Sequence, residues 1–251
     1  GCYNGMQRSL SNEWQFTELR SDNAKQGAPG STASANRDYS DLDMFIPSPS
    51  QQQIYNYWLA TYNNIRNINI VLQKLGVVYD EAAGTFTFNA ITIPITETDR
   101  KQLAGEAMFL RAYHYFNMVR LFGGVFLVHE PISPSAALQM NRATATDIYK
   151  LIQADLVTGA ASMNNLKFSQ IQPANQGRAT SWAAKGLLAK VYLTLGRKSE
   201  AVTLLQDVIT NSGYSLQSVY ANVFSISNEM NSEILFAVRY KAGGIGLGSH
   251  F

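Results

Sequence analysis

The sequence predicts a mostly α-helical domain with tetratricopeptide-like helix pairs and one small β-hairpin. Three observations favour this fold class. Residues 98–122 form a long run with apolar side chains on two sides, and residues 77–95 alternate around a short turn. Residues 178–212 follow the spacing of a ~34-residue tetratricopeptide unit. With 251 residues and 46% apolar side chains, the chain is long enough to bury a substantial core.

The N-terminal part predicts two helices separated by a loop. Residues 3–20 and 50–75 each carry apolar side chains at a helical period, so both are expected to form helices. Between them, residues 26–43 are rich in Gly, Ser, Ala and Asn and predict a long loop. Pro47 and Pro49 then hold the chain extended before the second helix begins.

A hairpin and a central helix are expected next. Residues 77–95 predict the hairpin, because two alternating stretches flank an Ala-Ala-Gly turn. In residues 98–122, Asp99 is placed to stabilise the first helical turn, and Gly123 is placed to end the helix. Both long sides of this helix are apolar, so we expect neighbours to pack on both.

Residues 144–163 predict a further helix, and residues 178–212 contain the clearest repeat signature. The repeat's bulky, aromatic, turn-glycine and small positions are occupied by Leu188, Tyr192, Gly196, Ala201 and Leu205. Lys185 and Ala189 replace the first Trp and Gly of the pattern, so the unit is degenerate. A single unit cannot bury its apolar face, and weaker helix pairs are expected to stack on it. Residues 234–240 predict a strand.

The string GEAMFLRAYHYFNMVRLFGGVFLV, residues 105–128, resembles the most recognisable segment of the SusD/RagB family. That family comprises outer-membrane lipoproteins of Bacteroidetes that capture nutrients, mostly glycans, at the cell surface. The resemblance is carried by Glu106, residues 109–112, Tyr113, Tyr115, Phe116 and residues 119–123. Phe126 stands where the family often has Pro. The resemblance implies a SusD-like helical domain spanning residues 1–251, as the N-terminal part of a family member whose C-terminal part is absent.

The resemblance also implies partners and a location. It predicts an oligosaccharide ligand and a TonB-dependent outer-membrane transporter, SusC-like, with no cofactor and no catalysis. It further implies a cell-surface lipoprotein of the outer membrane, with its lipid anchor upstream of this chain. Cys2 invites an alternative in which its own thiol is acylated, but Tyr3, Met6 and Leu10 follow at helical spacing and favour a buried cysteine in a helix.

Composition and spacing argue against several other functions. The net charge is only +2, which argues against nucleic acid as a main partner. One cysteine excludes an internal disulfide, and the three histidines lack metal-binding spacing. Residues 243–248, GGIGLG, lack the spacing and the following helix of a dinucleotide-binding loop. His114 is expected to be a core residue, and Arg111 and Arg120 to bond carboxylates or helix ends.

The candidate ligand residues are aromatic and acidic side chains in or beside the long polar loop. Sugar rings stack their C–H faces on flat aromatic side chains, while Asp, Asn and Gln bond the hydroxyls. The candidates are Trp14, Tyr39, Asp41, Asp43 and Phe45. Core packing is the expected role of the other conspicuous aromatics: Tyr55, Trp58, Tyr113, Phe116, Trp182 and Tyr192.

Two other functions remain open at this stage. One is a tetratricopeptide scaffold that binds a peptide or protein and no sugar, although such scaffolds usually have several well-formed repeats. The other is a glycosidase, which needs two carboxylates roughly 5–9.5 Å apart. Asp41, Asp43 and Asp22 are the carboxylates near the loop, but a solvated loop is their favoured role.

Overall fold

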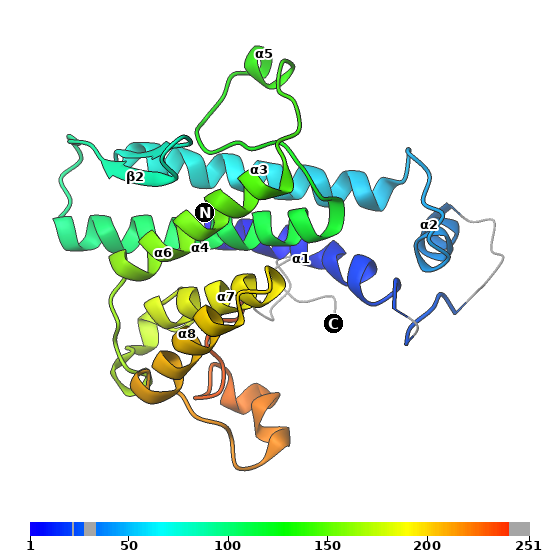
Figure 1. Ribbon diagram of the computed structural model, residues 1–251. Coiled ribbons are helices and arrows are strands. Elements are labelled where there is room, and N and C mark those ends of the chain that lie inside the picture. The colour runs from blue at the N-terminus through cyan, green and yellow to red at the C-terminus, as the bar shows by residue number, and fades with distance from the viewer. Residues whose placement is uncertain (22, 28–33, 241–251) are drawn as a thin grey trace. The chain divides into compact units, whose positions relative to one another are not determined.

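The computed structural model describes residues 1–21, 23–27 and 34–240 (Figure 1). The chain divides into two compact units. The first unit comprises Gly1–Asn67 together with Arg239 and Tyr240, and the second unit comprises Ile68–Val238. The predicted fold class is confirmed, because the elements are helices apart from one two-stranded sheet among the described residues. The prediction of one domain over residues 1–251 stays a prediction.

Three helices build the first unit: α1 (Cys2–Thr17), α2 (Ser34–Asp43) and the first part of α3 (Gln52–Lys74). The predicted helices at residues 3–20 and 50–75 are confirmed. The prediction of an uninterrupted loop over residues 26–43 is wrong, because α2 occupies its second half. Leu42 is only 2% exposed and anchors α2. The helix is short and has few apolar residues, so its sequence does not display a helical period.

Side chains of α1 and α3 pack closely within the first unit. The Phe16 and Tyr57 rings meet edge to face with centroids 5.2 Å apart. The Asn64 side-chain amide donates to the Cys2 carbonyl oxygen over 3.0 Å. Gly5 makes this approach possible, since a Cβ on it would lie 1.9 Å from Asn64 Oδ1. Cys2 is helical, as favoured, but half-buried, and this burial raises the pKa of its thiol.

The second unit begins with the end of α3 and the predicted hairpin. Strands β1 (Val77–Asp80) and β2 (Thr85–Phe88) pair antiparallel, with Val77 opposite Phe88 and Asp80 opposite Thr85. Gly84 has φ +71°, a conformation that favours glycine at the hairpin turn. The hairpin prediction is therefore confirmed at this turn.

Helix α4 (Glu97–Phe122) is the predicted central helix, and α6 (Ala145–Ser162) lies along it (Figure 1). Thr96 caps α4 by accepting a hydrogen bond from the Asp99 amide. Nearly every residue from 104 to 119 is buried, which confirms that neighbours cover both sides of α4. The two helices approach at Gly105 and Gly159, where a Cβ on Gly105 would lie 2.8 Å from the Gly159 carbonyl oxygen.

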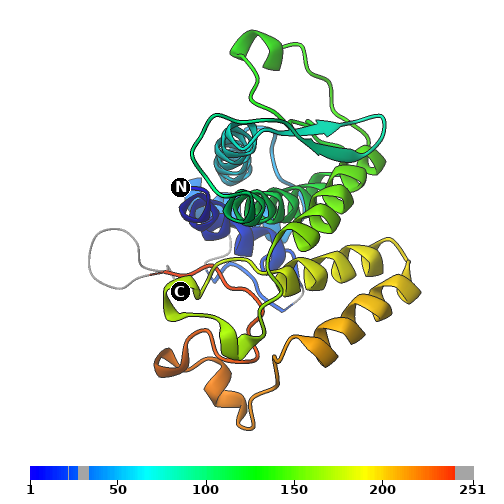
Figure 2. The same cartoon turned by 90° about the vertical axis from the view of Figure 1, so that its left-hand side faces the viewer.

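The predicted tetratricopeptide-like unit is the antiparallel pair of α7 (Ser181–Thr194) and α8 (Lys198–Asn211), with α7 packed on α6 (Figure 2). Gly196 has φ +75° at the turn between them, as the repeat pattern requires. Between α4 and α6 the chain forms a connection that contains the short helix α5 (Pro134–Ala137).

The prediction of a strand at residues 234–240 is wrong. This segment forms no regular element, and none of the described residues pairs with it as a strand. Its alternating apolar side chains pack on helices instead. The centroids of the Phe236 ring and the Phe109 ring of α4 are 4.8 Å apart. Leu235 packs against Gly186 of α7, where an added Cβ would lie 3.1 Å from a Leu235 methyl carbon.

Candidate functional site

Trp14 and Tyr39 lie together in the first unit. Their ring centroids are 6.1 Å apart with a 46° tilt, and both side chains are half-buried. Trp14 belongs to α1 and donates its indole N–H to the Ser11 carbonyl oxygen over 3.1 Å, so its ring orientation is fixed. Tyr39 belongs to α2. Two of the predicted ligand residues are thus brought into contact.

Phe45 occupies an unusual position at the end of α2. The Phe45 amide bonds the Leu42 carbonyl at 3.2 Å, and the Ile46 amide bonds the Asp41 carbonyl at 2.9 Å. This pair of bonds defines a Schellman motif, whose left-handed residue is usually glycine. Here that residue is Phe45, with φ +60°. An aromatic residue in this conformation costs about 1–2 kcal/mol, and such strain concentrates at functional sites.

The strained turn presents apolar side chains to solvent. Met44, Phe45 and Ile46 are 54%, 59% and 61% exposed. The Arg20 guanidinium lies over the Phe45 ring at 5.2 Å from its centroid, a cation–π contact. Sequence reasoning missed Arg20, because no motif links it to residues 44–46, which we call the Phe45 turn.

The acidic candidates lie on α2 next to this turn. Asp41 and Asp43 are both half-buried and belong to the last turn of the helix. Their positions place two carboxylates on the segment that also presents Phe45. Asp22, which was also considered, lies outside the described residues.

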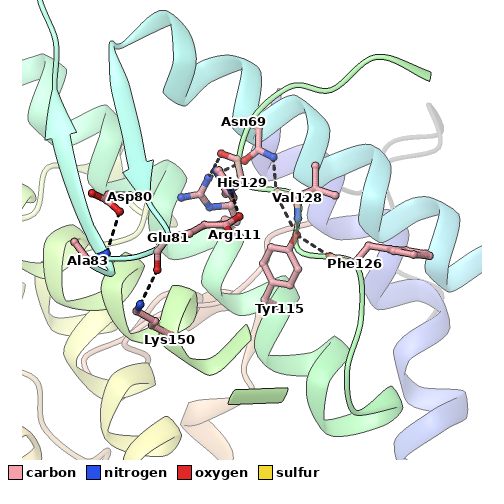
Figure 3. Close-up of polar contacts among 10 residues, drawn as sticks. All are labelled: Asn69, Asp80, Glu81, Ala83, Arg111, Tyr115, Phe126, Val128, His129 and Lys150. Carbon is pink, nitrogen blue, oxygen red and sulfur yellow. Dashed lines mark hydrogen bonds and ion pairs between the residues drawn. The ribbon is translucent and has the colours of Figure 1, made fainter. Parts of the chain in front are cut away.

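The second unit contains a buried polar cluster centred on Arg111 of α4 (Figure 3). Arg111 donates to both carboxylate oxygens of Asp155, at 2.7 and 2.9 Å, and to Asn69 Oδ1 at 2.8 Å. The Arg111 and Asp155 side chains are 1% and 0% exposed. Burial raises the pKa of Asp155, and the Arg111 charge opposes that rise. The predicted structural role of Arg111 is confirmed.

This cluster holds the segment that leaves α4. Arg111 donates to the His129 carbonyl at 2.9 Å, and Asn69 donates to the Val128 carbonyl at 2.8 Å. The Tyr115 hydroxyl accepts a hydrogen bond from the Val128 amide at 2.7 Å (Figure 3). Burial raises the pKa of Tyr115, so this hydroxyl stays neutral. The exit segment, residues 125–129, is therefore fixed without being a strand.

The tip of the hairpin is fixed by side chains from two other elements. Lys150 of α6 donates to the Glu81 carbonyl at 2.6 Å (Figure 3). It also donates to the Ala82 carbonyl at 2.7 Å. His129 Nε2 lies 2.7 Å from Glu81 Oε1. Beside these contacts is a pocket of about 250 Å³, which we call the hairpin pocket. Its lining includes Tyr79, Glu81, Leu127, Met140, Asp147 and Lys150.

A larger pocket of about 400 Å³ lies between the start of α4 and the α6–α7 connection. Gln102 accepts hydrogen bonds from Asn164 at its edge, and Arg178 lines the same space. Arg178 donates to the buried Glu106 carboxylate at 2.7 Å. No aromatic side chain belongs to the lining, as far as the structure describes the chain.

The other predicted roles are mixed. His114 is 1% exposed, as expected for a core residue, and Phe116 and Trp182 are buried. Tyr55 is 60% exposed, so its predicted core role is wrong.

In the described part of the chain, no group of three or more His, Cys, Asp or Glu side chains is arranged to hold a metal. Within the same residues, no helix is both long and apolar enough to span a bilayer.

Comparison with known proteins identifies the family. The model of a family called SusD-like and described as "Starch-binding associating with outer membrane" matches residues 2–193, well over half of the chain. This chain belongs to the SusD-like family. A SusD-like protein of Bacteroides ovatus is 33% identical over 159 residues, which are 58% of this chain and 28% of that protein. SusD-like protein P2 of Formosa agariphila is 25% identical and covers 88% of this chain and 40% of its own length.

Solved SusD-like structures share the fold. A laminarin-binding SusD-like protein has a TM-score of 0.79 at 27% identity, covering 94% of this chain and 48% of that one. Surface glycan-binding protein A of Bacteroides fluxus has a TM-score of 0.74 at 22% identity, which is a likeness of fold. The chain spans less than half the length of each of these SusD-like relatives.

Proposed function

We propose that this SusD-like chain captures a neutral oligosaccharide at the cell surface without cleaving it. The observation that carries the proposal is Phe45, an exposed ring that occupies a left-handed position usually taken by glycine, despite the backbone strain. A ligand contact through this ring gives the strained position a function. Membership of a family described as starch-binding and similarity to a laminarin-binding protein support the same class of ligand.

The chemistry of the first unit suits a sugar. The Arg20 guanidinium lies over one face of the Phe45 ring, and the opposite face offers a flat apolar surface to the C–H groups of a pyranose ring. The Asp41 and Asp43 carboxylates accept hydrogen bonds from hydroxyl groups, and Trp14 and Tyr39 supply a second aromatic surface. Phe45 and these four residues remain the proposed ligand contacts.

Delivery of the glycan completes the proposed function. The family description places its members in association with the outer membrane. We infer that a lipid anchor upstream of residue 1 holds the protein there, and that the ligand passes to a TonB-dependent, SusC-like transporter. The rigid surface of the α7–α8 pair suits a protein contact with that transporter.

The Phe45→Gly variant tests the proposal, because it removes the ring while relieving the strain. We expect its affinity for neutral glucan oligosaccharides, including fragments of laminarin, to fall by about 10-fold or more, as expected for loss of an anchoring aromatic. Its free energy of unfolding is expected to stay equal or to rise by up to about 1 kcal/mol. Calorimetric titration and urea unfolding measure the two quantities.

Met230→Gly is the matched control. Met230 also has a positive φ, +53°, and lies in the second unit. Its replacement relieves comparable strain, so we expect stability to respond similarly while glycan affinity is unchanged. If Phe45→Gly binds every glycan of the panel as the unchanged chain does, Phe45 is not a ligand contact.

One observation favours a second function, the binding of a protein segment. Val202, Leu205 and Ile209 lie on one face of α8 and are 49%, 36% and 76% exposed. Tetratricopeptide-like helix pairs stack through such faces. Failure to bind any glycan, with peptide binding retained, would favour this scaffold function over capture of a sugar.

A further inference from the structure

Tyr79 of β1 is a largely buried residue whose hydroxyl oxygen is not among the fully buried polar atoms and is therefore accessible. Its side chain lies between the Phe86 ring, 4.9 Å away, and the His129 ring, 5.4 Å away, and the residue is only 7% exposed. Among the residues that the structure describes, nothing forms a hydrogen bond with its hydroxyl. An accessible tyrosine hydroxyl without a protein partner can exchange its bond to water for a bond to a ligand hydroxyl.

Tyr79 lines the hairpin pocket, which collects polar groups from the hairpin and from α6. Glu81 comes from the hairpin tip, and Asp147 and Lys150 come from the start of α6. Leu127 of the exit segment and Met140 add apolar surface. A pocket with apolar walls and a few convergent polar groups is the usual form of a small-molecule site.

The polar groups of this pocket are held in place before any ligand arrives. Glu81 is fixed through its carboxylate by His129 and through its carbonyl by Lys150. The Asp147 carboxylate accepts a hydrogen bond from the Thr144 hydroxyl at 2.6 Å. A site whose groups are already ordered loses less conformational entropy on binding.

We propose that the hairpin pocket is a second saccharide subsite, which takes one neutral sugar unit and bonds one of its hydroxyls to the Tyr79 hydroxyl. This inference rests on the proposed glycan capture and adds a site to it. It lies wholly in the second unit, whereas the Phe45 turn belongs to the first.

Size and charge select a neutral sugar unit. A volume of about 250 Å³ is below the ~300–1,000 Å³ typical of pockets for drug-sized ligands, so one ring is the suitable occupant. Two carboxylates, Glu81 and Asp147, outnumber the single ammonium group of Lys150 in the lining, so the pocket disfavours an anion. The carboxylates accept hydrogen bonds from hydroxyl groups. Burial raises the pKa of Tyr79 to about 12, so its hydroxyl remains protonated and can donate to a sugar oxygen.

The test is a nuclear magnetic resonance titration of the ¹⁵N-labelled chain with D-glucose and with methyl glucoside. We expect saturable shifts of backbone amides around Tyr79, Ala143 and Asp147. The Tyr79→Phe variant keeps the ring and removes only the hydroxyl, and we expect it to bind about 3- to 10-fold more weakly. Tyr220→Phe is the matched control, because Tyr220 is 78% exposed and lies outside the pocket. It should bind as the unchanged chain does.

Several outcomes would overturn the subsite. One is the absence of sugar-dependent shifts at the hairpin pocket, and another is equal affinity of Tyr79→Phe and Tyr220→Phe. A third is that calcium chloride alone produces saturable shifts there while neither sugar does, which would make the pocket a cation site. The unchanged chain could bind oligosaccharide and Phe45→Gly lose that binding, while no amide around the hairpin pocket shifts. In that case the subsite fails and the proposed function stands.

Discussion

The Arg111→Met variant is expected to unfold with a free energy about 3–5 kcal/mol below that of the unchanged chain. The substitution leaves the fully buried Asp155 carboxylate without its counter-ion. It also removes the donor to Asn69 and to the His129 carbonyl. Urea unfolding followed by circular dichroism measures the loss. Arg66→Met is the matched control, because Arg66 is exposed on α3, and its effect should stay within about 0.5 kcal/mol.

A double variant separates the unpaired charge from the lost packing. Arg111→Met combined with Asp155→Leu removes both charges, and we expect it to recover much of the stability that the single variant loses. If Arg111→Met were as stable as Arg66→Met, the buried pair would not be what holds the exit segment.

We expect the second large effect to be a loss of stability in acid that is caused by His114. Burial lowers the pKa of this imidazole to about 3, from an ordinary value of 6.5. The unfolded chain therefore takes up a proton below about pH 6.5, whereas the folded chain does so only near pH 3. The resulting stability is fully present above pH 6.5 and is lost as the pH falls, by up to about 1.4 kcal/mol per pH unit.

The His114→Gln variant tests this assignment. Between pH 6.5 and 4.5 the unchanged chain should lose about 2 kcal/mol more stability than the variant, which has no imidazole to titrate at this position. Urea unfolding at pH 7.5 gives the baseline of each protein, because at this pH the imidazole is neutral in both the folded and the unfolded chain. If the free energies of unfolding of the two proteins fell in parallel as the pH was lowered, a group other than His114 would cause the loss of stability in acid.

The central architecture follows from local chemistry and could be predicted. Residues 98–122 have small and apolar side chains on both sides, and this composition allows helices to pack closely, as Gly105 and Gly159 do. The hairpin and the α7–α8 pair carry turn glycines at the positions that need positive φ, Gly84 and Gly196. Such signals depend on neighbouring residues alone.

Elements that depend on distant partners could not be predicted. Residues 234–240 alternate like a strand, but a strand requires a partner for its backbone, and Leu235 and Phe236 pack on helices instead. Helix α2 is too short to display a period. The Phe45 turn was missed as a Schellman motif, because the glycine that usually marks it is absent.

The candidate site was predicted only in part. Trp14 and Tyr39 are in contact, whereas the contribution of Arg20 depends on the fold. The hairpin pocket could not be predicted from the sequence, because the whole of α4 lies between Tyr79 and Asp147 in the chain. Residues that converge only after folding leave no local pattern.

The measurement that tests glycan capture most directly is a calorimetric titration with laminarin-derived oligosaccharides, followed by chromatography of the recovered ligand. The account predicts saturable binding by the unchanged chain and recovery of every oligosaccharide at its original length. Shortened products that disappear in Asp41→Asn or Asp43→Asn variants would contradict capture without cleavage. Absence of binding to any neutral glycan would contradict the proposed function itself.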